Sequence, residues 1–132
     1  MNSDFNQLIK EAKKIAEKRK LSEYATCGHT SCALLTKKGN IFTGISLELK
    51  CILGNCAEHA AISEMIKNGE TEIDKIVAYS SKGEIYTPCG KCREIIRMVD
   101  NRNLKTQILV KEDKILTLQE LLPEMFISKK NK

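Results

Sequence analysis

The sequence lacks any uninterrupted apolar run close to the roughly 20 residues that a membrane-spanning helix needs. It also lacks the pattern of a signal peptide, because residues 1–4 are not a basic segment followed by an apolar one. We therefore expect a cytoplasmic protein with no membrane partner. Proline is scarce, with two residues, and 42% of the residues are hydrophobic, which excludes the collagen-like and disordered classes. A length of 132 residues suits one domain, so we expect residues 1–132 to share a single core.

Aromatic residues are also few: there is no tryptophan, and tyrosine and phenylalanine contribute three residues each. The formal net charge of +5 would suit a nucleic-acid partner, but its distribution does not. Residues 1–20 hold six basic and three acidic side chains, residues 127–132 hold three lysines, and the remaining span has 13 basic and 14 acidic residues. A groove for phosphates needs clustered basic side chains, usually with aromatic ones for stacking. We interpret the basic ends as solvent-exposed and expect no nucleic-acid partner.

Cysteine, in contrast, is abundant for this length. An even number of cysteines would suit three disulfides in a secreted protein, but nothing in the sequence indicates export. In a reducing compartment cysteines are better explained as metal ligands or as small buried residues. The six cysteines lie at positions 27, 32, 51, 56, 89 and 92.

The hydrophobic pattern predicts helices and strands in the order helix, hairpin, helix, strand, helix, strand, strand, helix. The predicted helices cover residues 5–16, 56–67, 89–100 and 118–122, and the predicted strands cover residues 32–36, 41–46, 73–80, 106–111 and 114–116. A turn at residues 37–40 joins the hairpin, residues 47–55 form a loop, and Thr117 with Glu120 forms a capping box. This order indicates an α/β fold with one mixed five-stranded sheet and helices on its faces.

Two segments at predicted helix starts contain the residues suited to chemistry. They are Cys56-Ala57-Glu58-His59 and Pro88-Cys89-Gly90-Lys91-Cys92-Arg93. Cys-x2-Cys is a metal-ligand spacing, because a tight turn into a helix directs both sulfurs at one centre. Together with Cys56 and Glu58 it offers three thiolates and a carboxylate, the composition of a catalytic zinc site with an open fourth position. Two helix N-termini, each with roughly +0.5 charge, would offset the excess negative charge of three thiolates.

Glu58 has two interpretations. An acidic side chain in the first turn of a helix can simply complement the helix dipole. Two residues from a metal ligand, it can instead accept a proton from an activated water and pass it to a leaving group. A different class of function would follow if Cys51 closed a four-cysteine structural zinc site, because Glu58 would then have no task. We expect Cys27 and Cys32 to be small buried or partly exposed residues and His29 to be structural or a polar wall.

These motifs resemble the small cytidine deaminase family, which includes the blasticidin-S deaminases. The resemblance extends to His29-Thr30, Ala33-Leu34, residues 41–44 and Leu121-Leu122-Pro123 with Phe126, and it covers most of residues 24–126. It implies the three-layer cytidine-deaminase fold, one zinc ion per subunit held by Cys56, Cys89 and Cys92, and Glu58 as the proton shuttle. It also implies a homotetramer that takes part in pyrimidine salvage. The implied substrate is a small-molecule cytosine nucleoside, cytidine or deoxycytidine, converted to the uridine product with release of ammonia.

The sequence departs from the family pattern mainly at the residues that would contact the sugar of the substrate. The resemblance places Ser46, Glu48, Ala57 and Thr87 at the substrate, but the family usually has Asn-x-Glu where this chain has Ser46-Leu47-Glu48. Many members also have arginine after the catalytic glutamate, where this chain has His59, and the usual aromatic-proline element before the first strand is absent. A modified nucleoside such as blasticidin S is therefore the alternative substrate.

Overall fold

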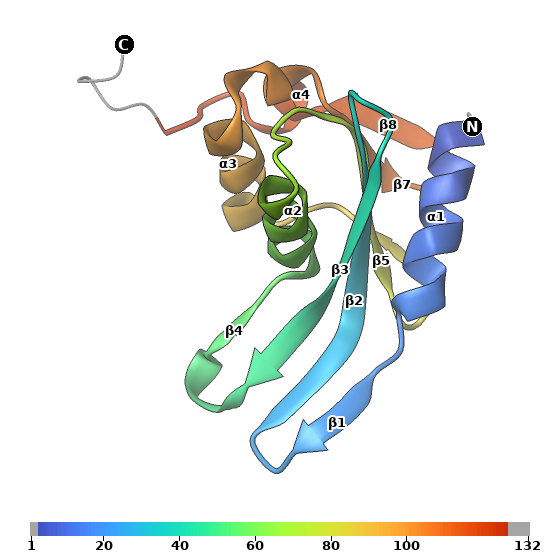
Figure 1. The fold of residues 1–132 in the computed structure, drawn as a ribbon, viewed down its shortest axis with the longest axis vertical. Helices are drawn as coiled ribbons and strands as arrows, with labels where there is room; N and C mark the ends of the chain where they lie inside the picture. Colours follow the sequence, from blue (N-terminus) through green and yellow to red (C-terminus); the bar gives the residue numbers. More distant parts are fainter. Residues whose placement is uncertain (1–2, 127–132) are drawn as a thin grey trace.

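The computed structural model describes residues 3–126, which form three layers with the sheet in the middle (Figure 1). The helices are α1 (Ser3–Ile15), α2 (Ala57–Lys67), α3 (Gly90–Val99) and α4 (Leu118–Leu121), with 3-10 turns at Lys50–Ile52 and Asn101–Lys105. The strands are β1 (Arg19–Ser22), β2 (Ala25–Thr36), β3 (Ile41–Leu49), β4 (Gly54–Asn55), β5 (Ile73–Ser80), β6 (Ile85–Tyr86), β7 (Gln107–Lys111) and β8 (Lys114–Thr117). Within these residues no helix is both long and apolar enough to cross a bilayer.

The sheet is mixed, as the sequence predicts. Its order is β4-β3-β2-β5-β7-β8, with β1 paired to β2 and β6 paired to β5. Among the strand pairs of the described residues, only that of β5 with β7 is parallel. The five predicted strands correspond to β2, β3, β5, β7 and β8, and the mixed α/β fold class is confirmed. The sheet has eight strands instead of the predicted five, because β1, β4 and β6 extend it.

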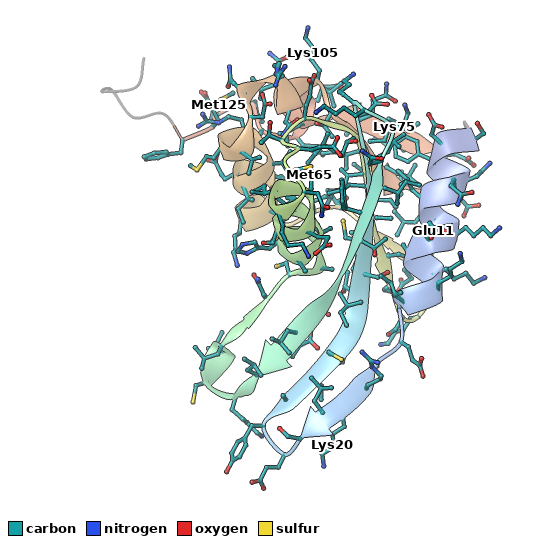
Figure 2. The ribbon with its side chains drawn as sticks, in the orientation of Figure 1. Glu11, Lys20, Met65, Lys75, Lys105 and Met125 are labelled. Atoms are coloured by element: carbon teal, nitrogen blue, oxygen red, sulfur yellow. The ribbon has the colours of Figure 1, made fainter. Side chains whose placement is uncertain are left out.

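The helices cover both faces because the buried strands alternate their side chains. Ala33, Val77 and Leu109 point to one face and pack against Phe5, Leu8 and Ala12 of α1. Their sequence neighbours Leu34, Ile76 and Ile108 point to the other face, where α2, α3 and α4 lie. Met65 of α2 is fully buried in this second core, where side chains fill the space between helix and sheet (Figure 2).

Gly44 brings α2 unusually close to the sheet. A Cβ atom at this position of β3 would lie 2.5 Å from the backbone nitrogen of Ala61 and 2.7 Å from the carbonyl oxygen of Ala57. Glycine is therefore required for the observed approach of helix and strand. This close packing fixes the N-terminus of α2, where Cys56 lies.

The structure corrects the predicted elements at one end of the sheet. The hairpin strands β2 and β3 are longer than predicted, and residues 47–55 are not a loop: β3 runs to Leu49, and β4 pairs back onto it after the 3-10 turn. Strands β1 and β6 were not predicted. The four residues of β1 are all exposed, so it has no hydrophobic alternation to reveal it.

The predicted capping box is present. The hydroxyl of Thr117 accepts a hydrogen bond from the backbone nitrogen of Glu120 at 3.2 Å, and the Glu120 carboxylate accepts one from the backbone nitrogen of Thr117 at 2.9 Å. Strand β5 has the predicted bounds, and α2 and α3 begin one residue later than predicted because Cys56 and Cys89 are their N-caps.

Candidate active site

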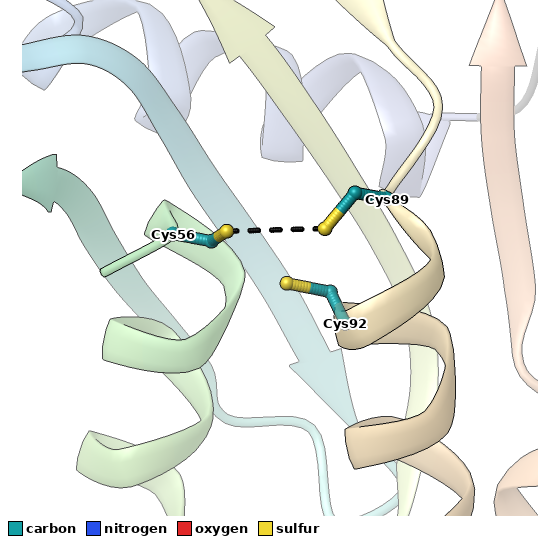
Figure 3. A group of neighbouring side chains, drawn as sticks. All are labelled: Cys56, Cys89 and Cys92. Carbon is teal, nitrogen blue, oxygen red and sulfur yellow. Dashed lines mark hydrogen bonds between the residues drawn. The ribbon is translucent and has the colours of Figure 1, made fainter. Parts of the chain in front are cut away.

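The three predicted ligand cysteines lie together at the starts of two helices (Figure 3). Cys56 is the N-cap of α2, Cys89 is the N-cap of α3, and Cys92 lies in the first turn of α3. Their three Sγ atoms are all within 4.8 Å of one another, and those of Cys56 and Cys89 are 3.9 Å apart. Two sulfurs bound tetrahedrally to one zinc ion at 2.3 Å would be about 3.8 Å apart. The group therefore fits a zinc ion.

The surroundings of the three thiols shift their pKa values. Burial, followed by the charge of Glu58, raises the pKa of Cys92 well above that of a free thiol. Burial also raises the pKa of Cys56, despite a hydrogen bond with Cys92 that lowers it. Burial acts to raise the pKa of Cys89 as well, but hydrogen bonds with the Cys92 backbone and with the other two thiols lower it below the usual value. Three thiolates this close repel one another, so the donor set is suited to a divalent cation that removes the repulsion.

Glu58 lies in the first turn of α2, and it is 5% exposed. Burial raises the pKa of its carboxyl group, although a hydrogen bond to its own backbone nitrogen opposes the shift. Its charge opposes the ionisation of all three clustered thiols, although the pKa of Cys89 is lowered overall, so the carboxylate acts on the same centre as the sulfurs. A buried carboxyl group beside a metal site can exchange protons with a bound reactant.

A cavity of about 490 Å³ opens onto this centre. Seven of the eight residues predicted for the site line it: Ser46, Glu48, Cys56, Ala57, Glu58, Thr87 and Cys89. The eighth, Cys92, is fully buried next to the cavity wall. A cavity of this size is large enough for a small ligand such as a nucleoside.

Polar groups of β2 and β3 also line the cavity, among them Thr30, Ser46 and Glu48. The hydroxyl of Ser46 accepts a hydrogen bond from the backbone nitrogen of Thr30 at 3.1 Å. The carboxylate of Glu48 accepts one from the hydroxyl of Thr26 at 3.4 Å and lies 3.6 Å from Nε2 of His29. His29 is therefore a neighbour of Glu48 but is not among the residues that line the cavity, so its role as a polar wall stays a prediction.

The sequence analysis did not identify several residues of the cavity. The oxygen Oδ1 of Asn55 lies 2.7 Å from Nδ1 of His59 and accepts a hydrogen bond from Nζ of Lys91 at 3.3 Å. Asn55 and Lys91 both line the cavity, and their positions beside Cys56 and between Cys89 and Cys92 could have drawn attention to them. The cavity also includes the exposed apolar residues Ile52, Leu53 and Tyr86, whose sequence context gave no signal.

The remaining cysteines lie outside the cluster. Among residues 3–126, the group that could hold a metal ion contains only Cys56, Cys89 and Cys92. Cys51 is exposed in the 3-10 turn, so the arrangement does not support a closed four-cysteine site. Cys27 and Cys32 are buried in β2, as small structural residues would be.

Comparison with known proteins agrees with this geometry. Residues 3–107 match the family described as the cytidine and deoxycytidylate deaminase zinc-binding region. The chain is 35% identical over 79 residues to the blasticidin-S deaminase of Bacillus cereus, an alignment that covers 52% of this chain and 55% of that protein. It is 37% identical over 78 residues to a probable cytidine deaminase of Dictyostelium discoideum, with 54% and 53% covered. The chain thus spans about half the length of these curated relatives.

The fold has a counterpart among solved structures. The cytidine deaminase of Mycobacterium tuberculosis superposes with a TM-score of 0.79 at 24% identity, covering 96% of this chain and 100% of that one. The matched family region includes both cysteine segments and therefore the whole sulfur cluster. This chain belongs to the family of the cytidine and deoxycytidylate deaminase zinc-binding region.

Proposed function

We propose that the protein deaminates cytidine or deoxycytidine by hydrolysis, releasing ammonia and the uridine product. The proposal rests on the three clustered sulfurs at two helix N-termini, together with the buried carboxyl group of Glu58 and the cavity of about 490 Å³ that Cys56, Glu58 and Cys89 line. Cys56, Cys89 and Cys92 would hold one zinc ion per subunit. When bound, this ion supplies Lewis-acid chemistry that lowers the pKa of water to near neutrality.

Glu58 moves the protons of the reaction. It accepts a proton from the water that attacks C4 of the cytosine ring and delivers it to N3. It then transfers the second water proton to the exocyclic amine, so that the C4–N bond breaks and ammonia leaves. The burial that raises the pKa of Glu58 favours this role, because a carboxyl group with a pKa closer to neutrality can both accept and return a proton.

The cavity residues divide between the base and the sugar. Ala57 and Thr87 lie beside the cysteine segments and contact the cytosine ring, whereas Ser46 and Glu48 lie on β3 and contact the ribose hydroxyls. The Glu48 carboxylate suits this task because it can accept hydrogen bonds from two hydroxyls. Ser46 offers one hydroxyl, which already accepts a hydrogen bond from Thr30.

A modified cytosine nucleoside such as blasticidin S is the second candidate substrate. The serine at position 46 favours it, because serine offers the sugar fewer hydrogen-bonding groups than the asparagine usual in cytidine deaminases. The identities of 35% to a blasticidin-S deaminase and 37% to a probable cytidine deaminase do not separate the two substrates. In this case Glu48 would bind a cationic substituent instead of a hydroxyl.

The resemblance also leads us to propose a homotetramer. Ile52 and Leu53 beside the cavity are 101% and 64% exposed, and apolar side chains this exposed suit a protein–protein contact. Light scattering after gel filtration should give four times the chain mass of 14.9 kDa, whereas the mass of a single chain would reject the tetramer.

A panel assay tests the substrate assignment. Zinc-loaded protein is incubated with cytidine, deoxycytidine, cytidine 5′-phosphate, cytosine and blasticidin S, and ammonia release is measured for each. Highest kcat/KM on cytidine or deoxycytidine supports the proposal. Highest kcat/KM on blasticidin S would replace it with the second candidate, and no ammonia from any compound would reject both.

A further inference from the structure

Arg93, directly after the ligand cysteine Cys92, connects two parts of the chain that are far apart in sequence. Its Nε donates a hydrogen bond to the carbonyl oxygen of Pro88 at 2.8 Å, and its Nη1 donates one to the carbonyl oxygen of Leu121 at 3.3 Å. Both hydrogen bonds are partly buried, so solvent competes weakly with them. One guanidinium group thus holds the turn before α3 against the end of α4.

A hydrogen bond to the Pro88 carbonyl can affect the orientation of the neighbouring residue Cys89. Pro88 immediately precedes Cys89, which is the N-cap of α3 and has extended backbone angles. The orientation of the Pro88–Cys89 peptide sets the direction in which the Cys89 side chain leaves the backbone. Proline has no N–H group, so its carbonyl is the only backbone group through which this residue can be anchored by a hydrogen bond.

The neighbouring charged residues of α3 provide an informative contrast. Arg97, one turn later, donates a hydrogen bond to the carbonyl oxygen of Phe126, and Glu94 accepts one from the Phe126 backbone nitrogen at 2.7 Å. Residues 93, 94 and 97 therefore all bind the backbone of the segment from Leu121 to Phe126. Only Arg93 also reaches the turn that contains Cys89.

We propose that Arg93 is a positioning residue for the metal centre: by binding the carbonyl groups of Pro88 and Leu121 it fixes the Cys89 thiolate, and so it slows the loss of zinc. This inference rests on the proposed zinc site. Arginine suits the task because its planar group can donate to two acceptors at once, whereas lysine offers a single nitrogen. Groups that orient metal ligands typically change metal affinity by roughly 10- to 100-fold when they are removed.

The test compares zinc release from four proteins: wild type, Arg93→Ala, Arg93→Lys and, as the matched control, Arg97→Ala. Each is loaded with zinc and mixed with an excess of a chromogenic chelator, and the rate of release is recorded. We expect about 10-fold or faster release from Arg93→Ala, an intermediate rate from Arg93→Lys, and the wild-type rate from Arg97→Ala. Thermal unfolding of the zinc-free proteins, followed by circular dichroism, separates metal retention from general stability.

A spectroscopic readout reports the sulfur geometry directly. With Co²⁺ in place of zinc, the thiolate charge-transfer bands should change in Arg93→Ala and stay unchanged in Arg97→Ala. Wild-type release rates and spectra in Arg93→Ala would overturn the inference, as would equally fast release from Arg97→Ala. If Arg93→Ala does not fold, Arg93→Lys decides, and a wild-type release rate in that variant overturns it. Failure of the wild-type protein to bind zinc would instead reject the proposed function.

Discussion

The Sγ atoms of Cys56 and Cys89 lie 3.9 Å apart, although 33 positions separate the two residues in the sequence. The topology explains this approach. Helix α2 leads into β5 and α3 leads towards β7, and β5 and β7 are parallel neighbours. Both helices lie on one face of the sheet and run antiparallel to these two strands. They therefore begin at the same end of the sheet. The first residues of both helices therefore meet.

The first prediction concerns the metal. Replacing Cys56, Cys89 or Cys92 by serine should leave the purified protein with less than one zinc ion per chain and no deaminase activity, because in the proposed site each would supply one of three thiolate ligands. Elemental analysis of the purified variants measures the zinc content. Cys51→Ser is the matched control, since Cys51 is an exposed cysteine outside the cluster, and it should retain full zinc and activity. Loss of zinc from this control would show that the three-sulfur site is wrong.

The second prediction concerns Glu58→Gln. Glutamine keeps the shape of the side chain but cannot accept the proton, so turnover should fall by about 100-fold or more while the zinc content remains at one per chain. Steady-state ammonia release and elemental analysis on the same sample check both parts. Glu64→Gln is the control, because Glu64 lies on the same helix and forms an exposed ion pair with Lys67. If Glu58→Gln kept the wild-type turnover, Glu58 would not be the residue that transfers the protons.

The sequence was sufficient to predict the centre of the fold and the cysteine cluster. Strand β5 and the capping box of Thr117 and Glu120 were predicted correctly because buried strands and caps have strong local patterns. The cluster was predictable because each cysteine segment begins a helix, where the thiol positions follow from the turn alone. Only the topology was needed to bring the two segments together.

The contacts between β2 and β3 beside the cavity were not predictable in the same way. Strand β2 continues from the buried residues back to Ala25 through a bulge that contains Gly28, with a φ of +81°. The bulge interrupts the alternation on which strand prediction depends. As a result, the contacts of Thr26 and Thr30 with Glu48 and Ser46 could not be inferred from sequence. These contacts are long-range, and they depend on the register between β2 and β3.

The third prediction concerns Glu48. If its carboxylate binds the ribose hydroxyls, Glu48→Ala should lower kcat/KM for cytidine by roughly 10- to 150-fold. This corresponds to a loss of about 1.5–3 kcal/mol of transition-state stabilisation, the range for hydrogen bonds to a charged group. Thr26→Val is the matched control, because it removes the hydroxyl that donates to Glu48 at 3.4 Å and keeps the carboxylate. The control should change kcat/KM much less. Unchanged cytidine turnover in Glu48→Ala, with another cytosine compound as the better substrate, would reject the nucleoside assignment.

The fourth prediction concerns the neighbouring Ser46. Ser46→Asn should increase kcat/KM for cytidine, because an amide offers both a donor and an acceptor to the sugar while its oxygen can still accept from the Thr30 backbone nitrogen. The ratio of kcat/KM for cytidine to that for blasticidin S measures the effect without interference from general changes in activity. A lower ratio in the variant would indicate that Ser46 does not face a ribose.

The fifth prediction concerns the close packing of α2 on the sheet. A methyl group at Gly44 would meet the backbone of Ala61 at 2.5 Å and that of Ala57 at 2.7 Å, and these atoms belong to the helix that begins at Cys56. Gly44→Ala should therefore lower the free energy of unfolding by about 1–3 kcal/mol, the usual cost of overpacking, and weaken zinc binding by displacing Cys56. Urea denaturation and zinc titration measure the two effects.

Gly90→Ala is the control for this experiment, because a Cβ at the first position of α3 would meet nothing within 4 Å. Its free energy of unfolding should change by less than about 0.5 kcal/mol, as expected for a substitution without steric conflict. If Gly44→Ala were as stable as Gly90→Ala and bound zinc as tightly, α2 could not lie as close to β3 as the structure places it. An interaction other than the packing of α2 on the sheet would then have to hold Cys56 close to the cysteines of α3.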